Sequence, residues 1–262
     1  MVLFERIVPK SIIQAGKLMQ EKTIFISGAE RGLGAALTEL FIQKGHVVVA
    51  GYYHDNQSFF TSVSKSYPGQ LWTLPLDVSD TRSVGHAANF CESVVSEIDI
   101  VINNAGILGN VDQSLPGVFD YQDVIDVFNV DAVGALRVTN ELFPLLTGTN
   151  GFLIVNISSE AGSISTCDRS AWFGYGMAKA ALNMATMILH HRLKEFTGDI
   201  VAIHPGGMQS PMRRPHDPPG EITPQESAIG IYTIIEDRFA TGTVRKEAEM
   251  KFIDYTGEVI PW

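Results

Sequence analysis

The sequence of 262 residues contains only two cysteines, Cys91 and Cys167, which are too few for a disulfide framework. It also has few basic residues, because 19 lysines and arginines stand against 29 aspartates and glutamates and give a net charge of −10. That sign argues against nucleic acids and anionic membranes as main partners. No apolar run reaches the roughly 18 residues of a membrane span. We therefore expect a cytoplasmic protein with reduced thiols and no membrane span.

The first twenty residues lack the unbroken apolar block of a signal peptide, because charged residues such as Glu5 and Lys10 interrupt them. We interpret residues 1–20 as a short N-terminal extension and residues 21–262 as one domain. With 45% hydrophobic residues, this domain can bury a sizeable core. There is no internal repeat or low-complexity linker that would divide it further.

Short apolar runs alternate with helical patterns along the chain. The runs are nearly continuous in apolarity, which is typical of strands buried on both faces. Between the first two, a helical stripe extends from Leu33 to Phe41 and Gly45 ends it. Thr223-Pro224-Gln225-Glu226 has the form of a capping box and predicts another helix start. The alternation predicts an α/β fold with a single-domain, doubly wound parallel sheet, the Rossmann fold. The six predicted strands are Thr23–Ser27, His46–Gly51, Leu71–Leu76, Asp99–Ile102, Phe152–Ile157 and Asp199–Ile203.

A glycine-rich segment, Ser27-Gly28-Ala29-Glu30-Arg31-Gly32-Leu33-Gly34, follows the first predicted strand. Glycines at a strand-to-helix turn let the backbone approach a phosphate closely. The N-terminus of the following helix offers free N–H groups and a positive dipole end to a pyrophosphate. The segment predicts a dinucleotide site, although ordinary tight turns can have the same pattern.

Tyr175 and Lys179 stand four residues apart, so a helix would place both on one face. An ammonium beside a phenol favours phenolate and lowers the tyrosine pKa from about 10 towards neutral pH. Together with the glycine-rich segment, this pair predicts hydride transfer between a nicotinamide and a carbonyl group. The proline-rich segment from Gly206 to Gly220, with Arg213 and Arg214, is either a lid over such a site or a plain surface loop.

These motifs resemble those of the short-chain dehydrogenase/reductase family through most of the chain. The glycine spacing matches that family, with Ser27 in place of its threonine. Further motifs match in the same order: Asn103-Asn104-Ala105-Gly106, Val155–Ser159, Tyr175–Lys179 and Pro205-Gly206. Many motifs in one order make the resemblance highly specific.

The resemblance implies a catalytic tetrad of Asn129, Ser159, Tyr175 and Lys179. Tyr175 would be the general acid in reduction and the base in oxidation. Lys179 would lower the pKa of Tyr175 and bind the nicotinamide ribose. Ser159, or alternatively Ser158, would hold the substrate carbonyl. Asn129 would anchor a water molecule that returns the proton.

The resemblance also implies the cofactor contacts. Leu76-Asp77-Val78 would hold the adenine, and Pro205-Gly206 would contact the cofactor, with Ser210 where threonine is usual. Including Tyr175 and Lys179, we expect the cofactor to contact Gly28, Arg31, Gly32, Leu33, Gly34, Tyr53, Asp77, Val78, Asn104, Ala105, Gly106, Pro205, Gly206 and Ser210. No set of spaced histidines, cysteines or carboxylates predicts a metal site.

NADP(H) is the favoured cofactor, and NAD(H) remains possible. The second predicted strand ends in Gly51-Tyr52-Tyr53-His54, without the acid that grips the ribose hydroxyls of NAD, and Asp55 lies further along. Arg31 could pair with a 2′-phosphate. Glu30 is an unfavourable neighbour for that phosphate unless it points away.

Within the family, the sequence looks like the sniffer / C-factor branch. Ser159 and Tyr175 are 16 residues apart, where about 13 is usual, and the extra residues lie within Ser163–Phe173. Sniffer-type members are carbonyl reductases, whereas C-factor is a signalling protein. We therefore expect a carbonyl reductase, with a signalling protein that uses the nucleotide as a structural ligand as the alternative. The resemblance also implies a homodimer or homotetramer formed through helices after Asp123 and Gly174.

Overall fold

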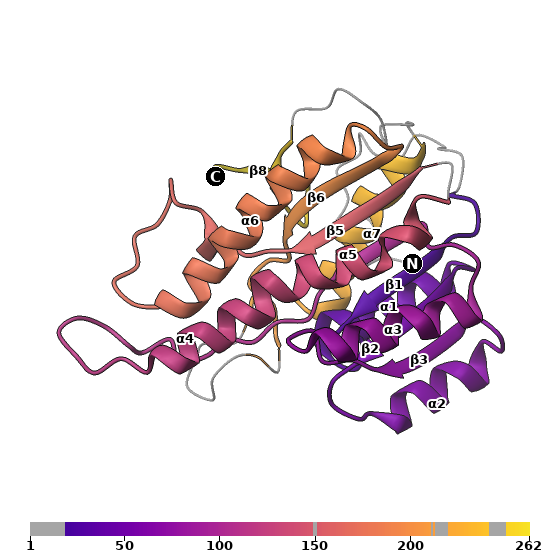
Figure 1. Ribbon diagram of the computed structural model, residues 1–262, viewed down its shortest axis with the longest axis horizontal. Helices are drawn as coiled ribbons and strands as arrows, with labels where there is room; N and C mark the ends of the chain where they lie inside the picture. Colours follow the sequence, from indigo (N-terminus) through magenta and orange to yellow (C-terminus); the bar gives the residue numbers. More distant parts are fainter. Residues whose placement is uncertain (1–18, 149–150, 211, 213–219, 241–249) are drawn as a thin grey trace.

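A computed structural model describes residues 19–148, 151–210, 212, 220–240 and 250–262 (Figure 1). The described residues form one eight-stranded sheet in the order β3-β2-β1-β4-β5-β6-β7-β8. Strands β1 to β7 run parallel, and β8 pairs with β7 in the antiparallel direction. The strands are β1 (Thr23–Ser27), β2 (Val47–Tyr52), β3 (Leu71–Pro75), β4 (Ile100–Asn103), β5 (Phe152–Ile157), β6 (Gly198–His204), β7 (Phe252–Asp254) and β8 (Val259–Ile260).

Helices cover both faces of the sheet (Figure 1). They are α1 (Gly32–Gln43), α2 (Gln57–Ser66), α3 (Thr81–Val94), α4 (Tyr121–Phe128), α5 (Ala135–Leu146), α6 (Phe173–Leu193) and α7 (Pro224–Ala240). A π-helical turn, Asn129–Gly134, joins α4 to α5, and a 3-10 turn, Glu160–Gly162, follows β5. The predicted doubly wound Rossmann fold is confirmed, and each predicted strand lies within one residue of the observed one.

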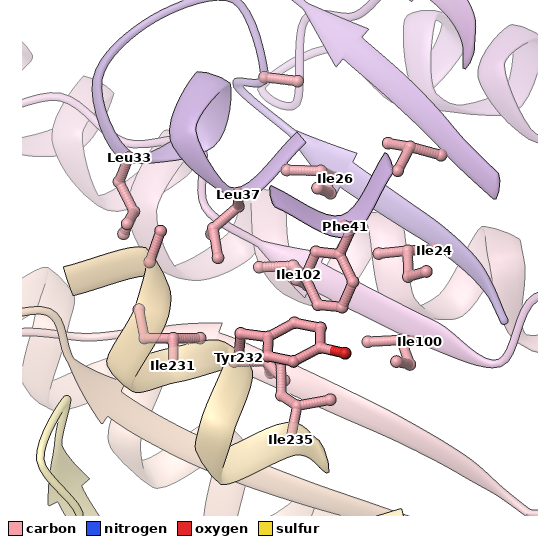
Figure 2. Packing of buried hydrophobic residues seen from close by; sticks show 14 of the residues in the cluster. Ile24, Ile26, Leu33, Leu37, Phe41, Ile100, Ile102, Ile231, Tyr232 and Ile235 are labelled. Atoms are coloured by element: carbon pink, nitrogen blue, oxygen red, sulfur yellow. The ribbon is translucent and has the colours of Figure 1, made fainter. Parts of the chain in front are cut away.

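The core has two layers, one on each face of the sheet. Side chains alternate along a strand, so Ile24 and Ile26 of β1 pack on the face with α1 and α7, whereas Phe25 packs on the face with α3 and α5. Figure 2 shows the first layer, in which the rings of Phe41 and Tyr232 meet edge to face at 5.3 Å between centroids. Continuous apolarity of the central strands therefore reflects burial on both faces.

The predicted helix ends are found in the structure. Gly45, with φ 87°, follows the end of α1 in a left-handed conformation that suits glycine. At the start of α7, the Thr223 N–H donates to Glu226 Oε2 at 2.7 Å and the Glu226 N–H donates to Thr223 Oγ1 at 3.2 Å. This is the reciprocal capping box that the sequence predicted.

The strand order reverses between β1 and β4, which are neighbours in the sheet. The connections leaving β1 and β4 turn to opposite faces, and ligands of such sheets bind in the resulting crevice. Most of the predicted extension and residues 211 and 213–219 of the predicted lid lie outside the described residues. Among the helices described, none is long and apolar enough to cross a membrane.

Candidate active site

The loop after β1 is shaped by its glycines. Gly28 and Gly32 have φ values of 66° and 53°, which side-chain-bearing residues rarely adopt. A Cβ atom on Gly34 would lie 2.0 Å from the carbonyl oxygen of Gly28. Gly34 therefore lets the backbone of α1 pack directly against the backbone of the loop.

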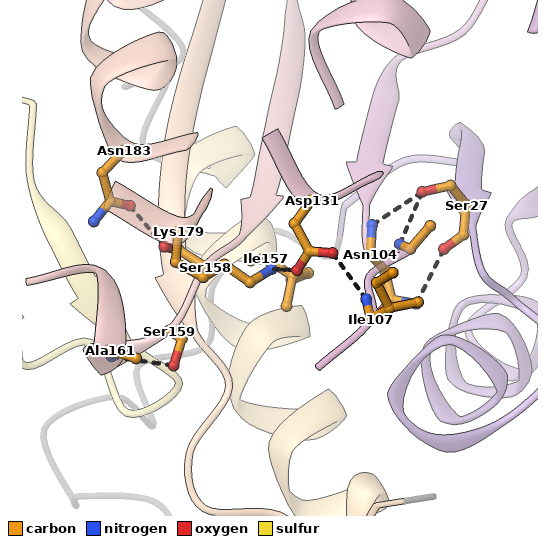
Figure 3. A network of polar contacts seen from close by, with 11 residues as sticks. Ser27, Asn104, Ile107, Asp131, Ile157, Ser158, Ser159, Ala161, Lys179 and Asn183 are labelled. Carbon is orange, nitrogen blue, oxygen red and sulfur yellow. Dashed lines mark hydrogen bonds and ion pairs between the residues drawn. The ribbon is translucent and has the colours of Figure 1, made fainter. Parts of the chain in front are cut away.

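Ser27 and Asn104 tie this loop to the segment after β4. Ser27 Oγ accepts hydrogen bonds from the N–H groups of Asn104 and Ala105, both at 3.1 Å. In return, Asn104 Nδ2 donates to the carbonyls of Ser27 at 3.0 Å and Gly28 at 2.9 Å (Figure 3). The hydroxyl that the sequence retains at Ser27 therefore fixes two walls of one cleft relative to each other.

The N-terminus of α1 is suited to an anion. Arg31 is the N-cap residue, but its side chain makes no capping hydrogen bond, and the first turn contains no acidic residue. The first N–H groups of α1 consequently have no side-chain acceptor and can donate to a phosphate. With the close backbone approach at Gly34, these residues fit the pyrophosphate of a dinucleotide.

The adenosine end of the cleft carries a buried acid. Glu30 is 4% exposed, and its Oε1 accepts a hydrogen bond from the His54 N–H at 3.3 Å. Asn56 Nδ2 donates to the Glu30 carbonyl at 2.7 Å, so the glycine loop is joined to the segment after β2. Arg31 is exposed and lines the same cleft.

Helix α6 brings Tyr175 and Lys179 to the other end of the cleft, as the sequence predicted. Lys179 Nζ lies 5.4 Å from the centroid of the Tyr175 ring and donates to the Ile157 carbonyl at 3.1 Å. A Cβ atom on Gly162 would lie 2.7 Å from the carbonyl carbon of Lys179. The glycine therefore allows the turn after β5 to approach α6 closely.

The two serines after β5 have different surroundings. Ser158 Oγ donates to Asn183 Oδ1 at 2.6 Å and is committed to that buried bond. Ser159 Oγ accepts from the Ala161 N–H at 3.2 Å (Figure 3). A hydrogen bond with the Ser159 side chain also acts to lower the pKa of Tyr175. Of the two alternatives left by the sequence, this geometry favours Ser159 as the residue beside the reacting carbonyl.

The structure does not bring Asn129 to this cluster. Asn129 Nδ2 donates to the Ser79 carbonyl at 3.3 Å, and its Oδ1 accepts from Arg137 at 3.1 Å. The side chain beside Lys179 belongs to Asp131, whose Oδ2 lies 3.0 Å from Nζ. The Asn129 side chain therefore lies away from this cluster, and its role in anchoring a water molecule stays a prediction. The π-helical turn instead points Asp131, two positions later, towards Lys179 of α6.

The sequence predicted that Lys179 lowers the pKa of Tyr175 towards neutral pH, but in the structure this pKa is raised. Burial raises the pKa of Tyr175; the Lys179 ammonium acts to lower it, and the Asp131 carboxylate raises it. Burial acts to lower the pKa of Lys179, but Asp131 outweighs burial and the pKa is raised. At neutral pH, Tyr175 is thus a protonated phenol beside a charged ammonium.

These groups share one cleft of about 550 Å³. Apart from Gly34 and Asn129, all predicted site residues line it. Glu30, His54 and Leu76, which the sequence placed near the cofactor, also line it. Other lining residues were not predicted as site residues and come from the same connections: Ser79, Ile107, Leu108, Val130, Ile157, Glu160, His204, Gly207, Met208 and Met212. In the described part of the chain, no three His, Cys, Asp or Glu side chains are grouped to hold a metal ion.

Trp172, just before α6, lines the cleft. It has φ 71°, an unusual value for a bulky residue, and its ring meets that of Tyr175 edge to face at 5.9 Å. Phe173 instead packs on Phe119, with 5.2 Å between ring centroids. Strained backbone of this kind is most often found at functional sites.

Comparison of the chain with known proteins agrees with this geometry. Residues 22–219 match the short chain dehydrogenase family. C-signal of Myxococcus xanthus is 30% identical over 176 residues, 67% of this chain and 98% of that protein. A short-chain dehydrogenase/reductase of Burkholderia multivorans, solved with bound NADP, is 25% identical with a TM-score of 0.80, over 93% of this chain and 100% of that one. The carbonyl reductase Sniffer of D. melanogaster has the same fold, with 22% identity and a TM-score of 0.76 over 93% of this chain and 100% of that one.

The chain therefore belongs to the short-chain dehydrogenase family and is an oxidoreductase by that membership.

Proposed function

We propose that this protein is an NADP(H)-dependent carbonyl reductase. The observation that carries the proposal is the convergence of Ser159, Tyr175 and Lys179 on the cleft that also contains the glycine loop. A hydroxyl, a phenol and an ammonium at one end of a dinucleotide cleft form a proton-donating device beside the place where a nicotinamide would bind.

Each residue of this device has a separate role. The bound nicotinamide supplies the hydride. Ser159 donates a hydrogen bond to the carbonyl oxygen and stabilises the charge that develops there. Tyr175, protonated in the ligand-free protein, gives its proton to that oxygen. Lys179 stabilises the phenolate that remains and binds the nicotinamide ribose.

The preference for NADP(H) rests on charge around the adenosine end. Arg31 is exposed at the N-terminus of α1, where it can pair with a 2′-phosphate. The Glu30 carboxylate lines the same cleft and accepts a hydrogen bond from the His54 N–H through Oε1. The NADP bound to the Burkholderia multivorans relative gives further support.

Several apolar residues outside the predicted cofactor contacts line the cleft. Ile107, Leu108, Trp172, Met208 and Met212 line the cleft. Glu160 and His204 are among the polar residues of the lining. An apolar wall with few polar groups suits a hydrophobic aldehyde or ketone.

A turnover screen tests the proposed function. The purified full chain is mixed with NADPH or NADH and a panel of aldehydes, ketones and quinones, and the loss of absorbance at the reduced-nicotinamide band is followed. We expect NADPH-dependent reduction of at least one apolar carbonyl compound. Tight cofactor binding with no turnover on any compound would instead support the signalling alternative.

That alternative is a protein of the C-factor kind, in which the nucleotide is a structural ligand. The similarity to C-signal supports it. The complete set of Ser159, Tyr175 and Lys179 disfavours it, because a binding protein has no chemical need of all three. Three other expectations stay predictions. They are the assignment to the sniffer / C-factor branch, the division into an extension at residues 1–20 and one domain at 21–262, and the cytoplasmic location.

We further propose that the protein forms a homodimer or homotetramer. Helices α4 and α6 contact each other and expose large apolar side chains outwards, among them Ile125 (57%), Met184 (63%) and Ile188 (61%). Large apolar side chains exposed on two neighbouring helices suit a subunit interface. Light scattering at micromolar concentration should give a mass of at least two chains, and Met184→Glu should lower it. A monomeric wild type would contradict the proposal.

A further inference from the structure

Lys179 is held by a buried carboxylate. Its Nζ lies 3.0 Å from Asp131 Oδ2, and the two side chains are 5% and 0% exposed. Nζ also donates to the Ile157 carbonyl at 3.1 Å. Figure 3 shows the ammonium beside the Asp131 carboxylate. A pair this deeply buried is costly unless its remaining hydrogen bonds are made, so the surroundings of Asp131 decide what it does.

Asp131 is supported by the wall of the nucleotide cleft. Its Oδ1 accepts a hydrogen bond from the Ile107 N–H at 2.8 Å. A Cβ atom on Gly106 would lie 3.0 Å from Oδ2, so only glycine leaves room for the carboxylate without adjustment. The residue lies in the π-helical turn Asn129–Gly134, and such turns are frequent at functional sites. The carboxylate therefore links the segment after β4 to the catalytic lysine.

Of the negative groups that face the Tyr175 phenol, Asp131 has the larger effect on its pKa. The charged and titratable groups that face the phenol come from three elements: Lys179 on its own helix, Asp131 on the π-helical turn, and Glu160 on the turn after β5. Glu160 forms an ion pair with Arg169 at 2.8 Å. His204 lines the cleft, and burial lowers its pKa to about 4, so it is neutral at neutral pH.

We propose that Asp131 is a positioning residue whose carboxylate fixes the Lys179 ammonium against Ile157 and holds the proton on Tyr175 through neutral pH. The proposal rests on the proposed function, in which Tyr175 must be protonated to reduce a carbonyl. A neutral amide at this position could accept the same N–H bond but would lack the negative charge. As a consequence, Tyr175 keeps the proton that it must donate to the carbonyl oxygen at neutral pH.

The direction of the effect follows from the charges. Removing the Asp131 carboxylate makes loss of a proton from the Tyr175–Lys179 pair easier, because one nearby negative charge is gone. In Asp131→Asn, the pH at which Tyr175 ionises should fall by about one unit, the low end of the shift that a nearby charge causes. Carbonyl reduction should then lose activity at lower pH than in the wild type.

The test reads the tyrosine directly and needs no turnover. Absorbance at the phenolate band is titrated from pH 7 to the alkaline limit of folding, without cofactor, and the Tyr175 contribution is obtained by subtracting the titration of Tyr175→Phe. Asp131→Asn should ionise Tyr175 at lower pH than wild type does. Asp126→Asn is the matched control, because this exposed aspartate lies on the preceding helix and should change nothing.

If Asp131→Asn does not fold, Asp131→Ser replaces it, with the same expected shift, because a smaller side chain leaves room for water at the Ile107 N–H. A Tyr175 titration that is unchanged, or moves to higher pH, would overturn the proposal. A protein that shifts as expected but reduces no carbonyl would instead contradict the proposed function. The two failures are therefore distinguishable.

Where turnover is found, the alkaline limb of kcat/KM should move with the absorbance titration, while NADPH affinity should stay within a few-fold.

Discussion

Ser27→Ala is the substitution whose effect can be worked out most directly. Ser27 is 1% exposed, and its hydroxyl accepts the N–H groups of Asn104 and Ala105, both at 3.1 Å. Each hydrogen bond contributes about 1 kcal/mol net, so losing both should lower the free energy of unfolding by about 2 kcal/mol. For a chain of this size, the melting temperature should fall by about 4–8 °C.

Thermal and urea unfolding followed by circular dichroism measure this effect. Ser93→Ala is the matched control, because that hydroxyl lies on the surface of α3 and bonds its own helix, and it should change stability by less than about 0.5 kcal/mol. NADPH binding should weaken in Ser27→Ala only, because Asn104 loses its tie to the glycine loop. Equal stability of the two variants would refute the reasoning that the hydroxyl joins two walls of the cleft.

Three further predictions concern other parts of the molecule. Arg31→Ala should weaken NADPH binding by about 1–3 kcal/mol and leave NADH nearly unchanged in fluorescence titrations; equal losses would argue against a 2′-phosphate contact. Gly34→Ala should lower affinity for either cofactor at least about tenfold, because its Cβ would lie 2.0 Å from the Gly28 carbonyl, whereas Gly85→Ala meets open space and should bind normally. Burial lowers the pKa of His46 from 6.5 to about 4, so its contribution to stability is present above pH 6.5 and is lost as pH falls towards 4. His46→Gln should flatten that part of the melting-temperature profile, and the exposed His86→Gln should not.

The sequence predicted the sheet well because its central strands are buried on both faces. Nearly continuous apolar runs, as in Phe152–Ile157, leave little doubt about strand position, and that range is also the observed β5. Local signals were equally informative where the chemistry is local. The capping box at Thr223 and Glu226 is an example, because its two hydrogen bonds join residues three positions apart.

The catalytic cluster was predicted only in part, because one member depends on a helix irregularity. Asn129 matched the family motif by residue type, but side-chain direction in the π-helical turn differs from that in an α-helix. Asp131 did leave a signal, since it is a single acid between apolar residues at Val130 and Ala132. Its pairing with Lys179 spans 48 positions between two elements, and spacing alone does not reveal such a contact.

The rate of Tyr175→Phe tests the account's central claim most directly. This substitution removes the proton donor and keeps the ring that packs against Trp172. With the best substrate of the turnover screen, kcat should fall by roughly 10² or more, while NADPH affinity should stay within a few-fold because the glycine loop binds the phosphates. A Tyr175→Phe variant that reduces the substrate as fast as wild type would contradict the assignment of Tyr175 as the general acid.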